Sequence, residues 1–549
     1  MKAASAFLDV LDAAGIDTFF GLPGSTEAPL LEALRDRDFR YVLALHEGVA
    51  VSMADGYSRL RRAPAVVGLH TSVGTLNGLS QMMNALRDGS PLVVTAGHKD
   101  RHVLSEEGFC ALPELLAAAG AVTKWAYQSL TPEAVAPDLA HAIRVACAPP
   151  PGPTYLAVPE DLMAAEVEGG SVSATAIVSA PPVSSTPSPE SVGAAVDRLL
   201  AAERPVLVVG SAARDARAEV DELSRLCGLP VLHAQFTDLS DLPLGTTERS
   251  YLGMYGEDPA VLDGCDLVVA AGCRVFYPFS HATRPRLPQG AALVHLHDDP
   301  AQVGRATRAD VGLLGNVRAG VAAMADGVRR RGMDDGLRSR RQERVDRLAE
   351  SRREAKAAEI AAAAGASPMQ IEELAAVLGD VLPEDAVVVD EGVRSSRPLL
   401  RHLPIGPSQR LLRSSGGALG WGTPAAVGAK IGAPGRPVVA VVGDGSFQFS
   451  LQALWSAAQA GAALTIVVLD NGGYLAVKRA IEGHLGVDHD LRVHPGTEIT
   501  GIDHAEIARG YGARTVSPVD AESLRKGLVE GIEGDAVTVV HVPVAQLRP

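Results

Sequence analysis

The sequence predicts an α/β protein made of three doubly wound, parallel-sheet domains. Short apolar runs rich in β-branched residues alternate with helical stretches along the chain, which is typical of strands buried on both faces of a parallel sheet. Two segments of different composition divide the chain, and 549 residues suit three or four domains. We expect a first domain over 1–168, a middle domain over 187–330, a connecting helix over 331–365 and a last domain over 366–549.

The two dividing segments differ in kind. Residues 169–189 are rich in Ser, Pro, Ala and Gly, which bury little surface and favour an extended linker. Residues 337–364 alternate charges with a thin apolar stripe, a pattern found more often in a solvated connecting helix than in a binding element. The strand candidates of the three blocks come in pairs: 65–69 and 92–97, 206–210 and 267–272, 438–445 and 464–470. Ligands bind beyond the carboxyl ends of such strands, so those ends are where a site is expected.

Composition excludes several classes of function. Fifty Lys and Arg against 65 Asp and Glu give a net charge of −15, and aromatic residues make up 4%, so nucleic-acid binding is not expected. No apolar run approaches the ~18 residues of a membrane span. The N-terminal segment is an amphipathic helix interrupted by Asp9 and Asp12, not a signal peptide. Five cysteines without a Cys-x-x-Cys pair indicate small buried thiols in a reducing compartment, so we expect a soluble, cytoplasmic protein.

Two strand ends in the last block carry metal-binding chemistry. Gly443-Asp444-Gly445 follows a strand and opens a helix, whose free N–H groups and dipole suit a phosphate. Alone, Asp444 is more often a helix cap. The next strand ends in Asp470-Asn471-Gly472-Gly473, and 24 residues, 446–469, separate Gly445 from Asp470. One strand–helix–strand unit would bring Asp444 and Asn471 to the same sheet edge. Their oxygens, with a backbone carbonyl, suit Mg²⁺.

Gly443-Asp444-Gly445 followed at this spacing by Asn471 resembles the thiamine diphosphate motif of the pyruvate decarboxylase-like enzymes. The resemblance implies Mg²⁺ held by Asp444, Asn471 and the carbonyl of Gly473. Asp470 stands where the motif commonly has Asn and adds a negative charge nearby. The cofactor-binding residues that the resemblance implies are Glu47, Gly417, Leu419, Gly443, Asp444, Gly445, Ser446, Asn471, Gly473 and Tyr474.

Glu47, after a predicted strand and before a helix, is the expected activator of the cofactor. A carboxyl that protonates the aminopyrimidine ring makes the opposite amino group an imine, which can take the proton from the thiazolium carbon. The alternative for Glu47 is an ordinary acid at a helix start.

Segments 21–36, 68–97 and 416–430 resemble benzoylformate decarboxylase most closely among these families. The resemblance covers nearly the whole chain and is weakest in the middle block. It implies a pyrimidine-binding domain, a middle domain and a diphosphate-binding domain. It also implies a homotetramer, a dimer of dimers, with active sites between chains.

The resemblance implies roles near the substrate for Ser25 and His70 and a role beside the cofactor for Leu419. Ser25 matches a serine that binds the substrate carboxylate, and His70 matches a histidine that shuttles protons. For a lone histidine, a place in the core would be the commoner reading. Leu419 matches the apolar residue that holds the two cofactor rings in a bent shape.

The departures from the family pattern bear on substrate and product. Phe279 aligns with a second catalytic histidine, and His281 lies two residues later, so either His281 serves or the second histidine is missing. Its loss would favour a long-lived enamine, open to a second carbonyl acceptor. Ala480 replaces an aromatic residue of the substrate pocket, near Ala476, and leaves it wider or differently shaped.

The middle block lacks a Gly-x-Gly-x-x-Gly turn, so no dinucleotide is indicated there. Arg274 after a strand is only a weak phosphate signal, and we expect a structural domain without a cofactor.

The sequence thus predicts a thiamine diphosphate- and Mg²⁺-dependent, non-oxidative decarboxylase of small 2-oxo acids that releases an aldehyde by way of an enamine. The alternative is a carboligase or acetolactate synthase-like enzyme that passes the enamine to a second carbonyl. A third reading, a fold relative kept for interaction or regulation, is opposed by the presence of Glu47, Asp444 and Asn471.

Overall fold

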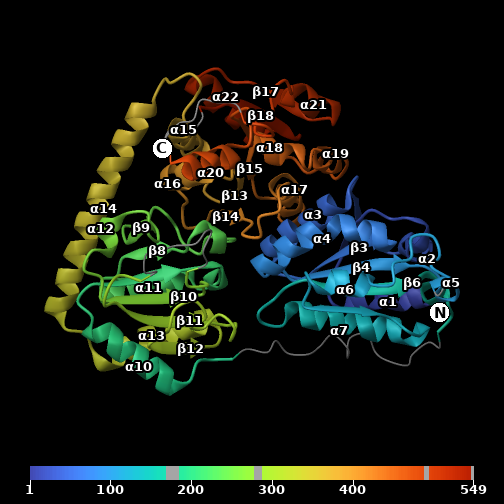
Figure 1. Ribbon diagram of the computed structural model, residues 1–549, viewed down its shortest axis with the longest axis horizontal. Helices are drawn as coiled ribbons and strands as arrows, with labels where there is room; N and C mark the ends of the chain where they lie inside the picture. Colours follow the sequence, from blue (N-terminus) through green and yellow to red (C-terminus); the bar gives the residue numbers. More distant parts are fainter. Residues whose placement is uncertain (105, 168–184, 277–286, 487–493, 546–549) are drawn as a thin grey trace.

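The computed structural model describes residues 1–104, 106–167, 185–276, 287–486 and 494–545 (Figure 1). It contains three six-stranded sheets whose paired strands are all parallel, as the sequence predicts. Most of the predicted linker, residues 169–184, lies outside the described residues.

The first sheet has the order β2-β1-β3-β4-β6-β5. Its strands are β1 (Thr18–Gly21), β2 (Arg40–Leu43), β3 (Ala65–His70), β4 (Leu92–His98), β5 (Trp125–Gln128) and β6 (Thr154–Pro159). Its helices are α1 (Ala3–Ala13), α2 (Ala28–Leu34), α3 (Glu47–Arg61), α4 (Thr71–Asp88), α5 (Arg101–Leu104), α6 (Leu115–Gly120), α7 (Val135–Cys147) and α8 (Glu160–Ala164). The predicted amphipathic helix at the N-terminus is α1, which buries Phe7, Leu8 and Leu11.

The second sheet has the order β12-β11-β10-β7-β8-β9. Its strands are β7 (Pro205–Val209), β8 (Val231–His233), β9 (Tyr251–Met254), β10 (Leu267–Ala271), β11 (Ala292–His297) and β12 (Val311–Leu314). Helices α10 (Pro189–Ala201), α11 (Arg217–Cys227), α12 (Pro259–Leu262) and α13 (Val317–Arg331) belong to this domain, and α14 (Asp335–Ala363) leads away from it.

The third sheet has the order β14-β13-β15-β16-β18-β17. Its strands are β13 (Val387–Glu391), β14 (Arg410–Arg413), β15 (Val438–Gly443), β16 (Thr465–Asp470), β17 (Arg514–Val516) and β18 (Thr538–Pro543). Its helices are α15 (Ile371–Val381), α16 (Ser396–His402), α17 (Gly422–Gly432), α18 (Asp444–Gln448), α19 (Gln452–Gln459), α20 (Leu475–Leu485), α21 (His504–Gly510) and α22 (Ala521–Glu533).

The strand orders divide the domains into two kinds. Counted within each domain, the first and last sheets share the order 2-1-3-4-6-5, whereas the middle sheet has the Rossmann order 3-2-1-4-5-6. In both orders the chain first runs one way across the sheet and then reverses between two neighbouring inner strands, and ligands bind at this reversal point. In the first domain it lies between β1 and β3, and in the last between β13 and β15.

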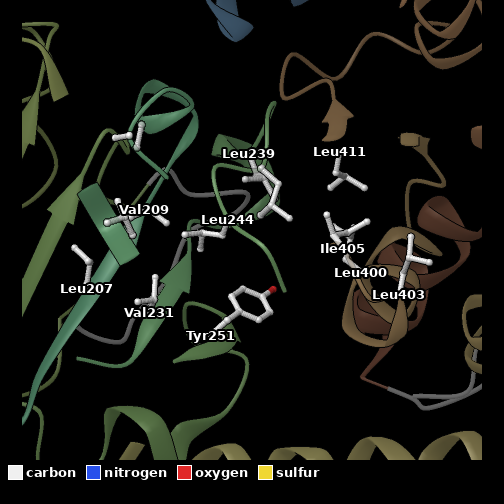
Figure 2. Packing of buried hydrophobic residues seen from close by; sticks show 14 of the residues in the cluster. Leu207, Val209, Val231, Leu239, Leu244, Tyr251, Leu400, Leu403, Ile405 and Leu411 are labelled. Atoms are coloured by element: carbon white, nitrogen blue, oxygen red, sulfur yellow. The ribbon is translucent and has the colours of Figure 1, made fainter. Parts of the chain in front are cut away.

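The last domain shares a hydrophobic core with each of the others. One buried cluster runs from the middle domain into the last, and Figure 2 shows Leu239 and Leu244 facing Ile405 and Leu411 across this boundary. A second cluster joins the first domain to the last through α3 and α17. Burial of this size fixes the three domains relative to one another.

Two glycines allow α3 and α17 to cross with their backbones in contact. A Cβ added at Gly428 would overlap the carbonyl of Met53, and one added at Gly56 would overlap the carbonyl of Ala425. Backbone atoms cannot move aside as a flexible side chain can.

Gly428→Ala is therefore expected to destabilise the protein by about 3 kcal/mol, which lowers the thermal midpoint by about 3 °C because the entropy of unfolding grows with the 549-residue chain. Gly435→Ala is the matched control, because an added Cβ there meets nothing within 4 Å. Differential scanning calorimetry of the two variants checks the prediction, and equal midpoints would contradict it.

The connecting helix differs from the solvated helix that its charges predict. One face of α14 is buried and carries Leu337, Arg341, Val345 and Arg352. Arg341 donates from its guanidinium to the carbonyls of Cys227, Leu199 and Ala202, at 3.1 Å and 2.8 Å for the first two. Arginines on this face lie inside the protein because backbone carbonyls and buried acids accept their hydrogen bonds.

The cysteines are all free, but only three are buried. Cys227, Cys265 and Cys273 lie in the core, whereas Cys110 is half-buried and Cys147 exposed, so the expectation of buried thiols is wrong for these two. In the described part of the chain, no helix combines the length and apolar character that crossing a membrane requires.

Candidate active site

The reversal point of the first sheet holds Ser25 and His70. Gly21, the last residue of β1, pairs with Gly68 of β3, so the turn after β1 lies beside His70, the last residue of β3. A Cβ added at Gly24 would overlap the His70 ring. This contact explains a glycine immediately before the exposed Ser25.

His70 is held by a buried carboxylate. Its Nδ1 lies 3.0 Å from Oε2 of Glu27, and the Thr26 hydroxyl lies 3.0 Å from the same nitrogen. A carboxylate only accepts hydrogen bonds, so Nδ1 donates to it and Nε2 is left to exchange a proton. Glu27 is itself fixed by the backbone N–H groups of Gly24 and Gly97, each at 2.8 Å.

Glu47 is the first residue of α3, and its side chain is 8% exposed. The amide of Asn77 donates to Oε2 of Glu47 at 3.0 Å. Gly74 lets α4 come close, because a Cβ there would be 3.2 Å from Oε1 of Glu47. The carboxyl therefore has a defined position beside α4.

The same face of α4 connects Glu47 with a loop of the last domain. Two turns further along α4, Gln81 donates to the carbonyl of Leu419 and Asn84 donates to that of Ala418, both at 2.9 Å. The loop is glycine-rich: Gly417 has φ +88°, and an added Cβ would meet nothing within 4 Å. Leu419 is half-buried.

Glu391, at the reversal point of the last sheet, shapes the other end of this loop. Its carboxyl accepts from the N–H groups of Gly420 at 2.9 Å, Trp421 at 3.2 Å and Gly422 at 2.7 Å. Burial raises the pKa of Glu391 to about 7, against the effect of the three N–H donors. The Trp421 indole donates to Asp55 at 2.6 Å.

The end of β15 meets the turn after β16. Gly443 pairs with Leu469, and the buried Asp444 begins α18. Oδ1 of Asp444 accepts from the N–H of Gly445 at 2.8 Å and Oδ2 from the N–H of Gly473 at 3.1 Å. The cap of α18 is Gly443, so Asp444 is not the helix cap. Burial raises the pKa of Asp444 to about 6, and the nearby Asp470 adds to the shift.

The extra charge at Asp470 has a partner. Nε2 of His541, on the neighbouring β18, lies 2.8 Å from Oδ2 of Asp470, and His504 lies 4.0 Å from the same oxygen. This hydrogen bond, with smaller charge effects from both histidines, lowers the pKa of Asp470. The departure from Asn is therefore balanced within the last domain.

Comparison with known proteins identifies the family. Three family models match: the N-terminal TPP binding domain of thiamine pyrophosphate enzymes over residues 1–117, their central domain over 192–324 and their C-terminal TPP binding domain over 395–542. Benzoylformate decarboxylase of Pseudomonas aeruginosa is 31% identical over 99% of both chains. The chain belongs to the thiamine pyrophosphate enzymes.

Other relatives of this thiamine pyrophosphate enzyme differ in their activities. The acetolactate synthase large subunit of Parasynechococcus marenigrum is 27% identical over 99% of this chain and 88% of its own length. The structure of a thiamine diphosphate-dependent 4-hydroxybenzoylformate decarboxylase from Rhodococcus jostii is 28% identical, with a TM-score of 0.87 over the whole of both chains.

The residues at the edge of the last sheet suit the diphosphate and cation of such an enzyme. A buried carboxylate, an amide side chain and a glycine carbonyl are the oxygen donors that Mg²⁺ prefers. Two glycines allow neighbouring segments to pack closely at this edge. A Cβ at Gly473 would overlap the carbonyl of Thr497, and one at Gly445 would lie 2.8 Å from the Tyr474 ring. Ser446 is buried in the first turn of α18.

The residues expected around the substrate are only partly described. Ala476 is half-buried and Ala480 exposed on α20, whereas Phe279 and His281 lie outside the described residues. Two cations of α20 near Ala480 have acid partners: Lys478 pairs with Glu498 at 2.8 Å and Arg479 with Glu482 at 2.7 Å. Arg274 likewise pairs with the buried Asp238 at 2.6 Å.

Sequence reasoning missed Glu27 and Glu391. Glu27 comes six residues after the end of β1 and Glu391 is the last residue of β13, so position at the carboxyl end of a strand was the available signal. Their partners lie far away in sequence: Glu27 contacts His70, and Glu391 contacts Gly420 to Gly422.

Glu27→Gln is expected to lower kcat by about tenfold to 100-fold with little change in KM, because the amide can present a donor to Nδ1 of His70 and release the ring. Steady-state kinetics checks this, together with a melting curve to exclude unfolding. Glu27→Asp keeps the charge and should fall between the wild type and Glu27→Gln. Unchanged kcat in Glu27→Gln would contradict the positioning role.

Proposed function

We propose that this thiamine pyrophosphate enzyme is a Mg²⁺-dependent, non-oxidative decarboxylase of small 2-oxo acids that releases an aldehyde. The observation that carries the proposal is the Glu27–His70 pair beside the exposed Ser25 at the reversal point of the first sheet. The full-length similarity to benzoylformate decarboxylase supports it. Bound thiamine diphosphate supplies the electron sink that decarboxylation of a 2-oxo acid needs.

The chain's own residues divide the work. Asp444, Asn471 and the carbonyl of Gly473 would hold Mg²⁺, and the N-terminal turn of α18 would face the diphosphate. Glu47 would hold a proton on the aminopyrimidine ring of the cofactor, where the hydrogen bond from Asn77 orients the carboxyl.

Substrate handling falls to the first domain. The exposed hydroxyl of Ser25 would donate to the substrate carboxylate. His70 would deliver or take a proton at Nε2, with Glu27 holding the ring in one orientation. Leu419, presented by the glycine-rich loop, would lie under the cofactor rings.

A second activity, ligation of the same intermediate to another carbonyl compound, is favoured by one observation. Ala480 is small and exposed where the family pattern has an aromatic residue, which suits a pocket with room for an acceptor. The similarity to an acetolactate synthase large subunit agrees with this alternative.

The proposed enzyme is a homotetramer, a dimer of dimers with active sites between chains, and cytoplasmic. Exposed apolar side chains near Glu47 support a subunit contact there: Leu45 is 43%, Val73 49% and Leu76 46% exposed. We assign pyrimidine binding to residues 1–168, diphosphate binding to 366–549 and a structural role to 187–330, with 331–365 as the connecting helix.

Product analysis tests the proposal. The enzyme, supplied with thiamine diphosphate and Mg²⁺, is given aromatic and aliphatic 2-oxo acids with and without an added aldehyde. Free aldehyde in yield equal to the CO₂ released supports a decarboxylase, whereas hydroxyketone as the main product supports the ligase. Absence of CO₂ release from all the acids would refute both.

A further inference from the structure

A cavity of about 700 Å³ lies where the connecting helix α14 meets the middle and last domains, and none of the candidate active-site residues lines it. Its walls come from α14, from the segment that leads into β9 and from the end of α16. Figure 1 shows α14 running along the middle domain toward the last domain. The volume falls within the range of small-molecule binding sites, about 300–1,000 Å³.

The face of α14 that lines this cavity carries cations. Arg352, Arg353 and Lys356 belong to the wall, and Arg249 joins them from the segment before β9. The acids in the wall are Glu248 and Glu350. Arg249 pairs with Asp346 at 2.6 Å and Arg353 pairs with Glu350, so these two cations already have acid partners.

The surrounding acids are already used by arginines. Glu257 is shared by Arg352 at 3.5 Å and Arg401 at 3.4 Å. Glu359 accepts two hydrogen bonds from Arg401, each of 2.7 Å, and a third contact of 2.7 Å comes from His402. Two carboxylates therefore serve two arginines and a histidine, and neither lies within ion-pair distance of Lys356.

Lys356 is the cation that remains. It is half-buried, and among the described residues it has neither an ion-pair nor a hydrogen-bond partner. Burial lowers its pKa to about 8; the charges of Arg352 and Arg401 add to the shift, while those of Glu257 and Glu359 oppose it. An ammonium group in this position is short of negative charge, which a ligand can supply.

The rest of the wall suits the organic part of a ligand. Tyr251, Ala357 and Ile360 line the cavity, and the guanidinium of Arg352 lies 5.9 Å from the centre of the Tyr251 ring. Figure 2 shows Tyr251 on the side of the middle domain that faces Leu400 and Leu403. Apolar walls around a few placed charges are typical of metabolite sites.

We propose that this cavity binds a small organic anion through a phosphate or carboxylate group, with Lys356 and Arg352 as its cationic contacts. The site is separate from Glu47, His70 and Asp444, so it does not depend on the activity proposed above. Because its walls belong to three parts of the chain, a bound anion would also stabilise the contact between the middle and last domains.

Calorimetric titration of the enzyme saturated with thiamine diphosphate and Mg²⁺ tests the proposal, since the cofactor then occupies its own site. The probes are inorganic phosphate, adenosine monophosphate and succinate, which distinguish a bare anion, an organic phosphate and an organic carboxylate. We expect one of the two organic probes to bind. We expect Lys356→Gln to weaken its binding at least about tenfold, the usual cost of one charged contact.

Two further variants make the result specific. Lys356→Arg keeps the charge and should bind within about threefold of the wild type. Lys526→Gln removes an exposed lysine of α22, 78% exposed, and should bind as the wild type does. Binding by the wild type that Lys356→Gln leaves unchanged would overturn the proposal, and so would failure of both organic probes to bind the wild type. Turnover with a 2-oxo acid is expected to stay the same in Lys356→Gln.

Discussion

Glu47→Gln is expected to lower turnover by about 100-fold or more, while the protein still folds and still binds thiamine diphosphate with Mg²⁺. General acid–base groups contribute rate factors of about 10²–10⁴. An amide cannot hold the proton that Glu47 is proposed to place on the aminopyrimidine ring. Its oxygen still accepts from Asn77, and its volume is nearly that of the carboxyl, so the buried start of α3 keeps its packing.

The experiment separates activation from binding. Single-turnover and steady-state rates are measured at saturating cofactor, and the cofactor dissociation constant is measured by calorimetry. Glu32→Gln is the matched control, because that glutamate is 59% exposed on α2 and should leave both quantities unchanged. Wild-type turnover in Glu47→Gln would refute the assigned role. A loss of cofactor affinity with unchanged turnover at saturation would turn Glu47 into a binding residue only.

The sequence was most informative where chemistry follows a strand. Buried parallel strands are recognised from composition, and their carboxyl ends meet at one edge, so Asp444 and Asn471 could be expected together from a spacing of 24 residues. The structure places the Asn471–Gly473 turn against Asp444 through the hydrogen bond from Gly473. Three sheets of parallel strands follow from the same regularity.

Other features depend on contacts that no local pattern encodes. Glu27 reaches His70 across 43 positions and Glu391 reaches Gly422 across 31, and strand order decides both contacts. The burial of Arg352 on α14 was predicted wrongly for a related reason. A helix rich in charged residues is expected in solvent unless the acids that pair with its arginines are known. The acid that pairs with Arg352 is Glu257, 95 positions away in the sequence.

Asp444→Asn is expected to abolish stable binding of Mg²⁺ and thiamine diphosphate, and activity with it. The variant removes the one charged ligand of the proposed metal site, and a neutral amide competes poorly with water for Mg²⁺. In the wild type, saturating cofactor should raise the free energy of unfolding by about 2.7 kcal/mol at 100 times the dissociation constant. This increment should vanish in Asp444→Asn.

Without cofactor, Asp444→Asn should have about the same free energy of unfolding as the wild type. The pH dependence of the free energy of unfolding checks the reason. Folding raises the pKa of Asp444 from 3.8 to about 6, so the folded state binds the proton more tightly than the unfolded state does. The carboxylate therefore lowers the free energy of unfolding as pH rises from about 4 to 6. Asparagine removes the free-energy cost of burying the carboxylate charge. It also has one acceptor oxygen fewer, so the N–H of Gly445 or Gly473 loses its hydrogen bond, and the two effects oppose each other.

Asp470→Asn is the matched control for Asp444→Asn. It makes the same chemical change one residue before Asn471 and restores the residue that the family motif commonly has. It loses the ionic partner of His541 but no proposed metal ligand, so the cofactor-induced rise in thermal midpoint should persist. Melting curves with and without Mg²⁺ and thiamine diphosphate compare the three proteins. If Asp444→Asn kept the rise, or if both variants lost it, the metal site would have to be assigned to other residues, because a ligand role predicts a loss at Asp444 alone.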